Sequence, residues 1–237
     1  MTLRMSRQDG LGAPAGAVLD RPALPRRDAR QAGDPITAVL RHVPQSEAAE
    51  LAAVLVDAGI NCIKLPLSDP SALANIETMA RICGDRAVIA AGSVLTTADV
   101  ERTARAGARR VLSPATDGAV IAHAGKLGLE TCPCAQTVTE ALAAHKAGAS
   151  ALGLFPASAA GPQTLAAIRA LLPAGFPIHA FGGITPADFP AWLAAGVTGF
   201  GLEGTLYKPG DRSQTVHLRA RILLTAAQNA LDEMDGG

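Results

Sequence analysis

The sequence predicts an α/β protein, a single-domain (β/α)8 TIM barrel, and three observations lead to this class. Short apolar runs alternate with Ala-rich amphipathic stretches from Asp34 onward. Glycines recur between each amphipathic stretch and the next apolar run, at intervals close to the length of one strand–helix unit. Apolar residues make up 49% of the chain and aromatic residues only 3%, which suits a large aliphatic core. Eight such units predict a closed barrel.

The predicted elements follow in order. The apolar runs predict strands at 36–41, 61–65, 87–91, 110–113, 129–132, 151–154, 178–181 and 199–202. The stretches between and after them predict helices at 45–58, 70–82, 97–106, 118–127, 137–147, 162–172, 186–195 and 213–232. A doubly wound open sheet is the rival architecture, but no GxGxxG string follows the first strand.

Helix ends carry their own signals. Thr96 and Thr185 can cap the helices that follow them, and Pro186 suits the first helical position. Glycines suit the helix-to-strand turns because they adopt the left-handed conformation; they are Gly59, Gly84, Gly107, Gly128, Gly148, Gly175 and Gly196.

The net charge and the length limit the classes of partner and the domain organisation that we expect. The chain has 237 residues, and its 21 basic and 21 acidic residues give a net charge of zero. We expect no nucleic-acid partner and no membrane partner, since both favour a basic excess and no long apolar run is present. Residues 1–33 carry six arginines and three aspartates without a sustained period, which predicts a flexible N-terminal extension before a barrel domain at 34–237. A short helix near Arg26–Gln31 is compatible with this.

The four cysteines, Cys62, Cys83, Cys132 and Cys134, form no CxxC pair and have no histidines at metal-finger spacing. They are interpreted as buried reduced thiols of a cytoplasmic protein. The N-terminus lacks the continuous apolar segment of a secretory signal. We expect no metal and no cofactor.

Barrel chemistry lies where the strands end, so the strand-end residues are the candidate site. Lys64 falls inside an otherwise buried strand, where a lysine is costly unless it has a function or a partner. Arg41 ends the first strand and offers a guanidinium fork for a carboxylate or a phosphate. Gly182 and Gly183 follow the seventh strand, where bare backbone N–H groups often hold phosphate.

Several strings together resemble a known family. They are Ala38–Arg41, Ile63–Leu67, Ala91–Leu95, Cys132–Pro133 with Thr137–Ala141, Leu154–Ser158 with Gly161–Gln163, and Gly182–Pro186. In this order they resemble the KDPG/KHG aldolases, and among these the 2-dehydro-3-deoxy-6-phosphogalactonate aldolase branch, over about residues 34 to 232.

The resemblance implies a homotrimeric lyase. It would cleave a 2-keto-3-deoxy sugar acid phosphate to pyruvate and glyceraldehyde 3-phosphate through a Schiff base on a strand 6 lysine, with a strand 2 glutamate moving protons. Arg41 matches the carboxylate-binding arginine, and Gly182 and Gly183 match the phosphate loop. Ser93 stands near the expected pyruvyl group, while Pro114 and Phe155 match pocket-lining positions.

Three positions depart from the family pattern. Gly153 stands where the resemblance places the Schiff-base lysine, and Lys64 stands where it places the catalytic glutamate. Glu203, followed by Gly204, replaces a Gly-Ser pair in the phosphate loop. One hypothesis is that the amine has moved to Lys64, with Arg41 lowering its pKa and Glu203 acting as proton relay or counter-ion. The other is that Lys64 and Glu203 only neutralise each other.

Three functions stay open at this stage. The first is a lyase of this family with altered catalytic residues. The second is a catalytically inactive or repurposed barrel that binds a keto acid or sugar phosphate. The third is a different reaction, such as isomerisation or dehydration of a sugar acid, in the same pocket. His42 is a weaker acid–base candidate at the mouth, and His179 is interpreted as a core histidine.

Overall fold

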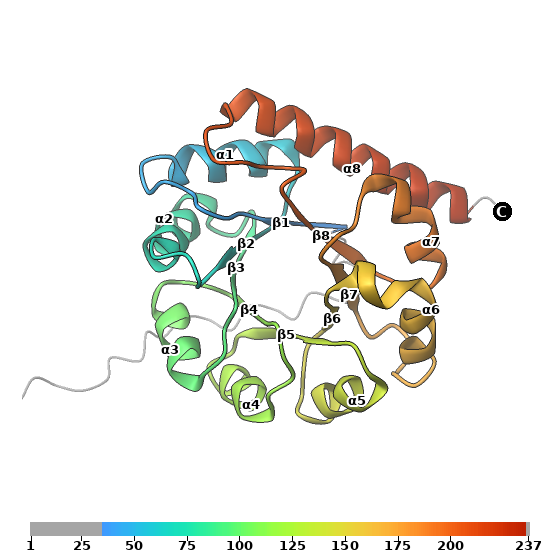
Figure 1. The fold of residues 1–237 in the computed structure, drawn as a ribbon. Helices are drawn as coiled ribbons and strands as arrows, with labels where there is room; N and C mark the ends of the chain where they lie inside the picture. The colour runs from blue at the N-terminus through green and yellow to red at the C-terminus, as the bar shows by residue number, and fades with distance from the viewer. Residues whose placement is uncertain (1–34, 236–237) are drawn as a thin grey trace, which may run out of the picture.

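The computed structural model describes residues 35–235. The predicted extension at 1–33, with its short helix, lies outside the described residues. Eight parallel strands close into a barrel in chain order, with β8 pairing back onto β1, and the helices surround them (Figure 1). The predicted (β/α)8 fold is confirmed.

The strands are β1 (Ile36–Val39), β2 (Cys62–Pro66), β3 (Val88–Gly92), β4 (Arg110–Ser113), β5 (Glu130–Ala135), β6 (Leu152–Leu154), β7 (Ile178–Phe181) and β8 (Gly199–Glu203). The helices are α1 (Ala48–Ala58), α2 (Ala72–Cys83), α3 (Thr97–Arg105), α4 (Gly118–Lys126), α5 (Val138–Lys146), α6 (Ala157–Arg169), α7 (Phe189–Ala194) and α8 (Ser213–Asp235). A 3-10 turn, η1 (Pro186–Asp188), precedes α7.

Most boundaries differ from the prediction by a few residues, and three of the differences bear on the site. β1 ends at Val39, so Arg41 lies just beyond the strand, and β5 continues to Ala135. α6 begins at Ala157 rather than at 162, because a first turn precedes a kink at Gly161, whose φ of 77° and ψ of 162° are not helical. Pro162 opens the second part of the helix, where its missing N–H costs nothing.

Side-chain caps set the starts of α3 and α5. The hydroxyl of Thr96 accepts the backbone N–H of Asp99, and the Asp99 carboxylate accepts the N–H of Thr96. Thr137 and Glu140 form the same reciprocal pair at α5. These caps satisfy backbone donors that would otherwise be orphaned, which fixes where each helix leaves its βα loop.

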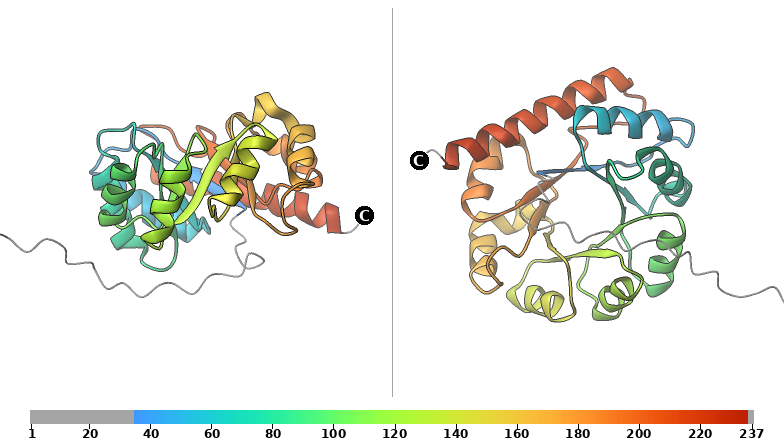
Figure 2. Two further views of the ribbon diagram at one scale, coloured as in Figure 1. Left: turned by 90° about the horizontal axis from the view of Figure 1, so that it is seen from below. Right: turned by 180° about the vertical axis from the view of Figure 1, so that it is seen from behind.

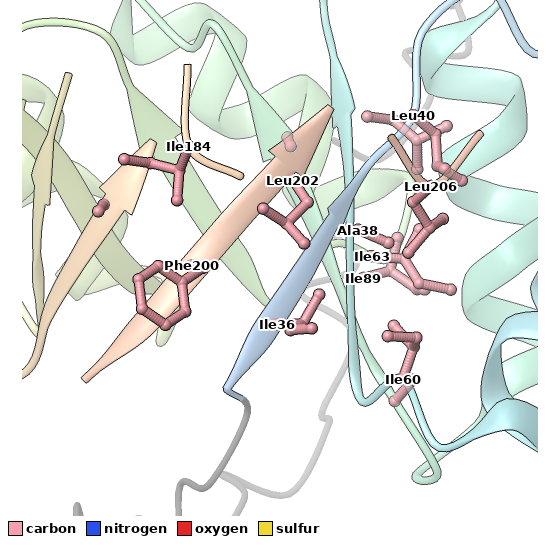
Figure 3. Packing of buried hydrophobic residues seen from close by; sticks show 14 of the residues in the cluster. Ile36, Ala38, Leu40, Ile60, Ile63, Ile89, Ile184, Phe200, Leu202 and Leu206 are labelled. Carbon is pink, nitrogen blue, oxygen red and sulfur yellow. The ribbon is translucent and has the colours of Figure 1, made fainter. Parts of the chain in front are cut away.

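Two apolar clusters hold the barrel together. The outer one fills the space between strands and helices, as the side chains of Ile36, Ile63, Ile89, Phe200 and Leu202 show (Figure 3). The inner one fills the barrel itself; it contains Val39, Cys62, Ala90, Leu112, Cys132, Cys134, Ala151 and Phe181. The barrel interior is therefore a packed core rather than an open channel.

The last helix covers two others. α8 runs along the outside of α1 and α7 (Figure 1, and Figure 2, right). No helix within residues 35–235 is long and apolar enough to cross a membrane. All four cysteines are buried and free, as predicted.

Candidate active site

A pocket lies at the C-terminal ends of the strands. Seven of its lining residues are ones that the sequence predicts: Arg41, Lys64, Ser93, Pro114, Phe155, Gly182 and Glu203. The other lining residues are Val39, Leu112, Ser113, Cys134, Phe181 and Gly201. Gly183 and Gly204 each lie one residue beyond a lining position and are not part of the wall. The predicted strand-end residues therefore gather in one pocket.

Lys64 enters the pocket from the middle of β2. Its stem passes over Gly92 on β3, where a Cβ would lie only 2.2 Å from the Lys64 Cε. Its Nζ lies 5.2 Å from the centroid of the Phe181 ring. Burial lowers the pKa of Lys64, and the Arg41 charge lowers it further by a smaller amount. The predicted direction is right, but burial rather than Arg41 is the main cause.

Arg41 and Glu203 form an ion pair. The Arg41 Nε donates to the Glu203 Oε1, and its Nη1 lies 3.5 Å from the hydroxyl of Ser68. In the sheet, Val39 is in register with Lys64 on one side and with Glu203 on the other. Arg41 therefore stands between the two, as predicted, but among the described residues it is Arg41, not Lys64, that pairs with Glu203. The Glu203 charge also raises the pKa of Lys64, by less than burial lowers it, so whether the two neutralise each other stays an open prediction.

Phe181, at the end of β7, lines the pocket between β6 and β8. A Cβ at Gly201 on β8 would lie 1.9 Å from its Cδ1, and a Cβ at Gly153 on β6 would lie 3.2 Å from its Cδ2. The ring thus requires glycine at 201 and leaves only a tight fit for a Cβ at 153. A side chain at 153 would also meet Cys134, whose Sγ is 2.7 Å from that Cβ position. Where the family resemblance expects a lysine, this barrel holds the Phe181 ring and a thiol.

Sequence reasoning missed Phe181 as a wall residue. One signal was available, since Phe181 alternates with His179 along the strand, which points both side chains into the barrel. Cys134 is predicted at the end of the fifth strand but without a role in the site, and it lines the pocket. Burial raises the pKa of Cys134 to about 11, so its thiol is neutral near pH 7 and is not a nucleophile there.

Two wall or rim residues have strained backbones. Ser93, at the end of β3, has φ of 56°, and His42, after β1, has φ of 53°. Left-handed backbone at a non-glycine residue is costly and gathers at functional sites. Ser93 lines the pocket, whereas His42 is exposed and bound to Asp69, which accepts its backbone N–H at 2.7 Å. His42 is therefore not part of the pocket wall.

His179 lies deeper in the barrel, below Phe181. It is buried, and its ring stacks on the Phe181 ring with centroids 6.2 Å apart. The prediction of a core histidine is confirmed. Within the described residues, no cluster of three or more His, Cys, Asp or Glu side chains has the arrangement of a metal site.

Comparison with known proteins places this site in a family. The sequence matches the family model of KDPG and KHG aldolases over residues 28–211. The chain belongs to the KDPG and KHG aldolase family. The resemblance that the sequence motifs carry is confirmed.

Two named relatives and one solved structure give the scale of the similarity. A protein of Rhizobium meliloti, named as a probable 2-dehydro-3-deoxy-6-phosphogalactonate aldolase, is 42% identical over 81% of this chain and 91% of its own length. The 2-dehydro-3-deoxy-6-phosphogalactonate aldolase of Escherichia coli is 36% identical over 83% of this chain and 96% of its own. A solved structure described as native KDPGal superposes with a TM-score of 0.80 at 35% identity, covering 84% of this chain and 96% of that one.

One pocket of this barrel brings together Lys64, Phe181 and Glu203, with glycines that make room for the first two. The amine of Lys64 is on β2 and the carboxylate of Glu203 is on β8. Gly153, on β6, has no side chain.

Proposed function

We propose that this chain is a Schiff-base lyase of the aldolase family, in which Lys64 is the amine. The substrate is a 2-keto-3-deoxy sugar acid, cleaved to pyruvate and an aldehyde. The names of its relatives support the reaction class. The observation that carries the proposal is the position of the Lys64 Nζ, inside a pocket at the catalytic end of the barrel.

The environment of Lys64 favours nucleophilic attack. Burial lowers its pKa, so the neutral amine is present at lower pH than for an exposed lysine. The face of Phe181 attracts the ammonium form, but the loss of solvation outweighs it in the direction of the shift. Gly92 leaves the space through which the stem reaches the pocket.

The reaction balances with the groups of this pocket. The Lys64 amine adds to the C2 ketone and water leaves, which forms a protonated imine. A base removes the proton of the C4 hydroxyl, the C3–C4 bond breaks, and its electrons form an enamine while the aldehyde departs. The enamine takes a proton at C3, and water hydrolyses the imine to release pyruvate and Lys64. Among the described residues that line the pocket, Glu203 is the one carboxylate, so we assign it the proton transfers.

The remaining predicted residues bind the substrate. Arg41 lies close enough to Lys64 to affect its pKa and presents its guanidinium to the substrate carboxylate while keeping its bond to Glu203. Ser93 offers a hydroxyl, and Phe155 and Pro114 supply apolar wall. Gly182 lets the backbone of the β7 loop approach the ligand, because a Cβ there would lie 3.0 Å from the Phe155 ring. Gly183 and Gly204 shape the two loops from outside the wall.

Borohydride trapping tests the proposal. The protein is incubated with pyruvate and sodium borohydride, and its intact mass is measured. We expect one reduced pyruvate per chain, lost in Lys64→Met and kept in the matched control Lys126→Met, on the exposed end of α4. Thermal unfolding of each variant verifies that it is folded. An adduct that persists in folded Lys64→Met, or no adduct in the wild type, contradicts the proposal.

A second candidate is a barrel that binds a keto acid or sugar phosphate without turnover. The observation in its favour is that Gly153 provides no nucleophile and that Phe181 and Cys134 fill the space beside it. Ligand-induced thermal stabilisation combined with no retro-aldol turnover over a panel of keto acids supports this candidate. Turnover that disappears in Lys64→Met rejects it.

We also propose that the protein is a cytoplasmic homotrimer. The family resemblance supports the trimer, and four buried free cysteines suit a reducing compartment. Light scattering on the eluting peak of a gel filtration column measures the oligomer mass, and a monomer would contradict the trimer.

A further inference from the structure

The pocket has little positive charge left for a phosphate. Its charged lining residues are Arg41, Lys64 and Glu203. The Arg41 guanidinium is already bound to the Glu203 carboxylate, so this pair is close to neutral as a unit. Beyond that pair the described lining has one cationic side chain, Lys64, and the Arg41 guanidinium is left to hold the carboxylate of a 2-keto acid. A phosphate ester would bring up to two further negative charges.

The end of the barrel that usually holds phosphate carries carboxylates here. In many barrels, the loops after strands 7 and 8 and a short helix N-terminus bind phosphate. In this protein β8 ends at Glu203, and β7 pairs with β8 through Phe181 and Gly201, so Glu203 lies level with the start of the β7 loop. The turn after that loop is already capped: Thr185 donates its backbone N–H and its hydroxyl to Asp188, at 2.8 and 2.7 Å.

The rest of the wall suits a neutral, hydroxylated chain. Leu112, Pro114 and Phe155 form an apolar side, and the hydroxyls of Ser93 and Ser113 lie among them. Such a wall can contact sugar carbons and bond their hydroxyls, but it has no cation to offer. The net positive charge is thus confined to the β1–β2 side, beside Lys64.

We propose that the pocket takes a 2-keto acid without a phosphate group, and that Glu203 is the residue that excludes the phosphorylated form. The keto acid itself rests on the proposed function, whereas the exclusion depends only on the charges. The Glu203 carboxylate offsets the Arg41 charge that a phosphate would otherwise use. Glu203 is 48% exposed and solvent screens the interaction, so we expect an effect of about tenfold in affinity.

Calorimetric titration with a matched pair of ligands tests the proposal. The ligands are 2-keto-3-deoxygalactonate and its 6-phosphate, titrated at low ionic strength into the full chain. We expect the wild type to bind the unphosphorylated acid at least about tenfold more tightly. Glu203→Gly removes the carboxylate, and we expect it to abolish or reverse this preference. Glu101→Gln, on the outer surface of α3, changes the net charge by the same amount and should leave the preference unchanged.

The outcomes separate this inference from the function it rests on. Equal or tighter binding of the phosphate ester by the wild type overturns the inference, even if pyruvate traps on Lys64. A preference that survives Glu203→Gly also overturns it. No binding of either acid to any variant overturns the ligand class. Conversely, a Glu203-dependent preference without a Lys64 adduct supports the inference and rejects the proposed chemistry.

Discussion

Lys64 is the most informative single residue, because one property, its burial, both lowers its pKa and favours its proposed chemistry. A lysine in the mouth of a barrel loses solvation, which disfavours the ammonium form and lowers the pKa. The same loss increases the share of neutral amine that can attack a ketone. The cost of burial is thus linked to reactivity, as is common where pKa values are shifted in functional sites.

This link predicts the pH dependence of the Lys64 adduct. The nucleophile is the deprotonated amine, so the rate of pyruvate trapping should rise with pH and level off once Lys64 has lost its proton. Because the Lys64 pKa is lowered, we expect the plateau well below the value of an exposed lysine, about 10.4. Trapping rates over a pH series, corrected for borohydride decay, measure it. A trapping rate that still increases when the pH reaches about 10.4 would contradict the lowered pKa of Lys64.

A second prediction at this scale concerns Gly92 as a positioning residue. Gly92→Ala places a Cβ 2.2 Å from the present Lys64 Cε, so the lysine stem has to move. Because that stem is flexible, we expect little change in unfolding free energy but at least a tenfold loss in trapping rate. Gly118→Ala, in the first turn of α4, is the control, since its Cβ meets only Ala147 at 3.9 Å. Unchanged trapping in folded Gly92→Ala would reject this role.

At the scale of elements, β6, β7 and β8 depend on one another through Phe181. The ring lies between two strands that each present a glycine, Gly153 and Gly201, and it is itself buried. The large Phe181 side chain on β7 faces a glycine on each neighbouring strand, so the barrel keeps its packing density. A side chain at 153 would require Cys134 to move, since its Sγ lies 2.7 Å from the Cβ position, and would leave the Phe181 ring a tight fit at 3.2 Å.

A double-mutant cycle measures this dependence. In Gly201→Ala the new Cβ would lie 1.9 Å from the Phe181 Cδ1, so we expect a loss of about 1–3 kcal/mol in unfolding free energy from overpacking. Phe181→Leu replaces the ring with a smaller side chain. In the Phe181→Leu protein, Gly201→Ala should cost much less unfolding free energy. Denaturant unfolding of the four proteins gives the coupling energy. Additive effects of the two changes would show that ring and glycine do not depend on each other.

The elements were predictable because each has a local signal, whereas the site was predictable only in part. Apolar runs mark the strands, and Thr96 and Thr137 mark helix starts by capping chemistry. Strand-end logic also places Arg41, Lys64 and Glu203 in one pocket. The Phe181 ring and the Arg41–Glu203 pair depend on which side chains meet across the barrel, and periodicity along one chain does not encode that.

At the scale of the whole molecule, the barrel interior is polar at the end away from the pocket. Arg110 on β4 is bonded to Glu130 on β5, with its Nη2 2.6 Å from the carboxylate, and its Nη1 contacts the Cys62 Sγ at 3.4 Å. His179 lies in the same interior, and both its burial and the Arg110 charge lower its pKa. The interior therefore holds one paired charge and a histidine that is kept neutral.

This arrangement predicts an acid-sensitive fold. The pKa of His179 is lowered to about 3, against about 6.5 in an unfolded chain, so between these values the unfolded state binds a proton that the folded state refuses. The contribution of His179 to the free energy of unfolding is complete above its unfolded-state pKa of about 6.5, and it is lost as the pH falls toward about 3. From pH 7 to pH 4 we expect it to cost about 3 kcal/mol.

Replacement of His179 isolates this contribution from that of the carboxylates, which also titrate at low pH. His179→Leu should show an unfolding free energy that declines less between pH 7 and pH 4, by about 3 kcal/mol, whatever its stability at pH 7. His145→Gln, on the exposed side of α5, should keep the wild-type pH dependence. Denaturant titrations of the three proteins at both pH values measure the difference. Parallel declines for wild type and His179→Leu would mean that the interior takes up the proton without cost, and would place the acid sensitivity in the surface carboxylates instead.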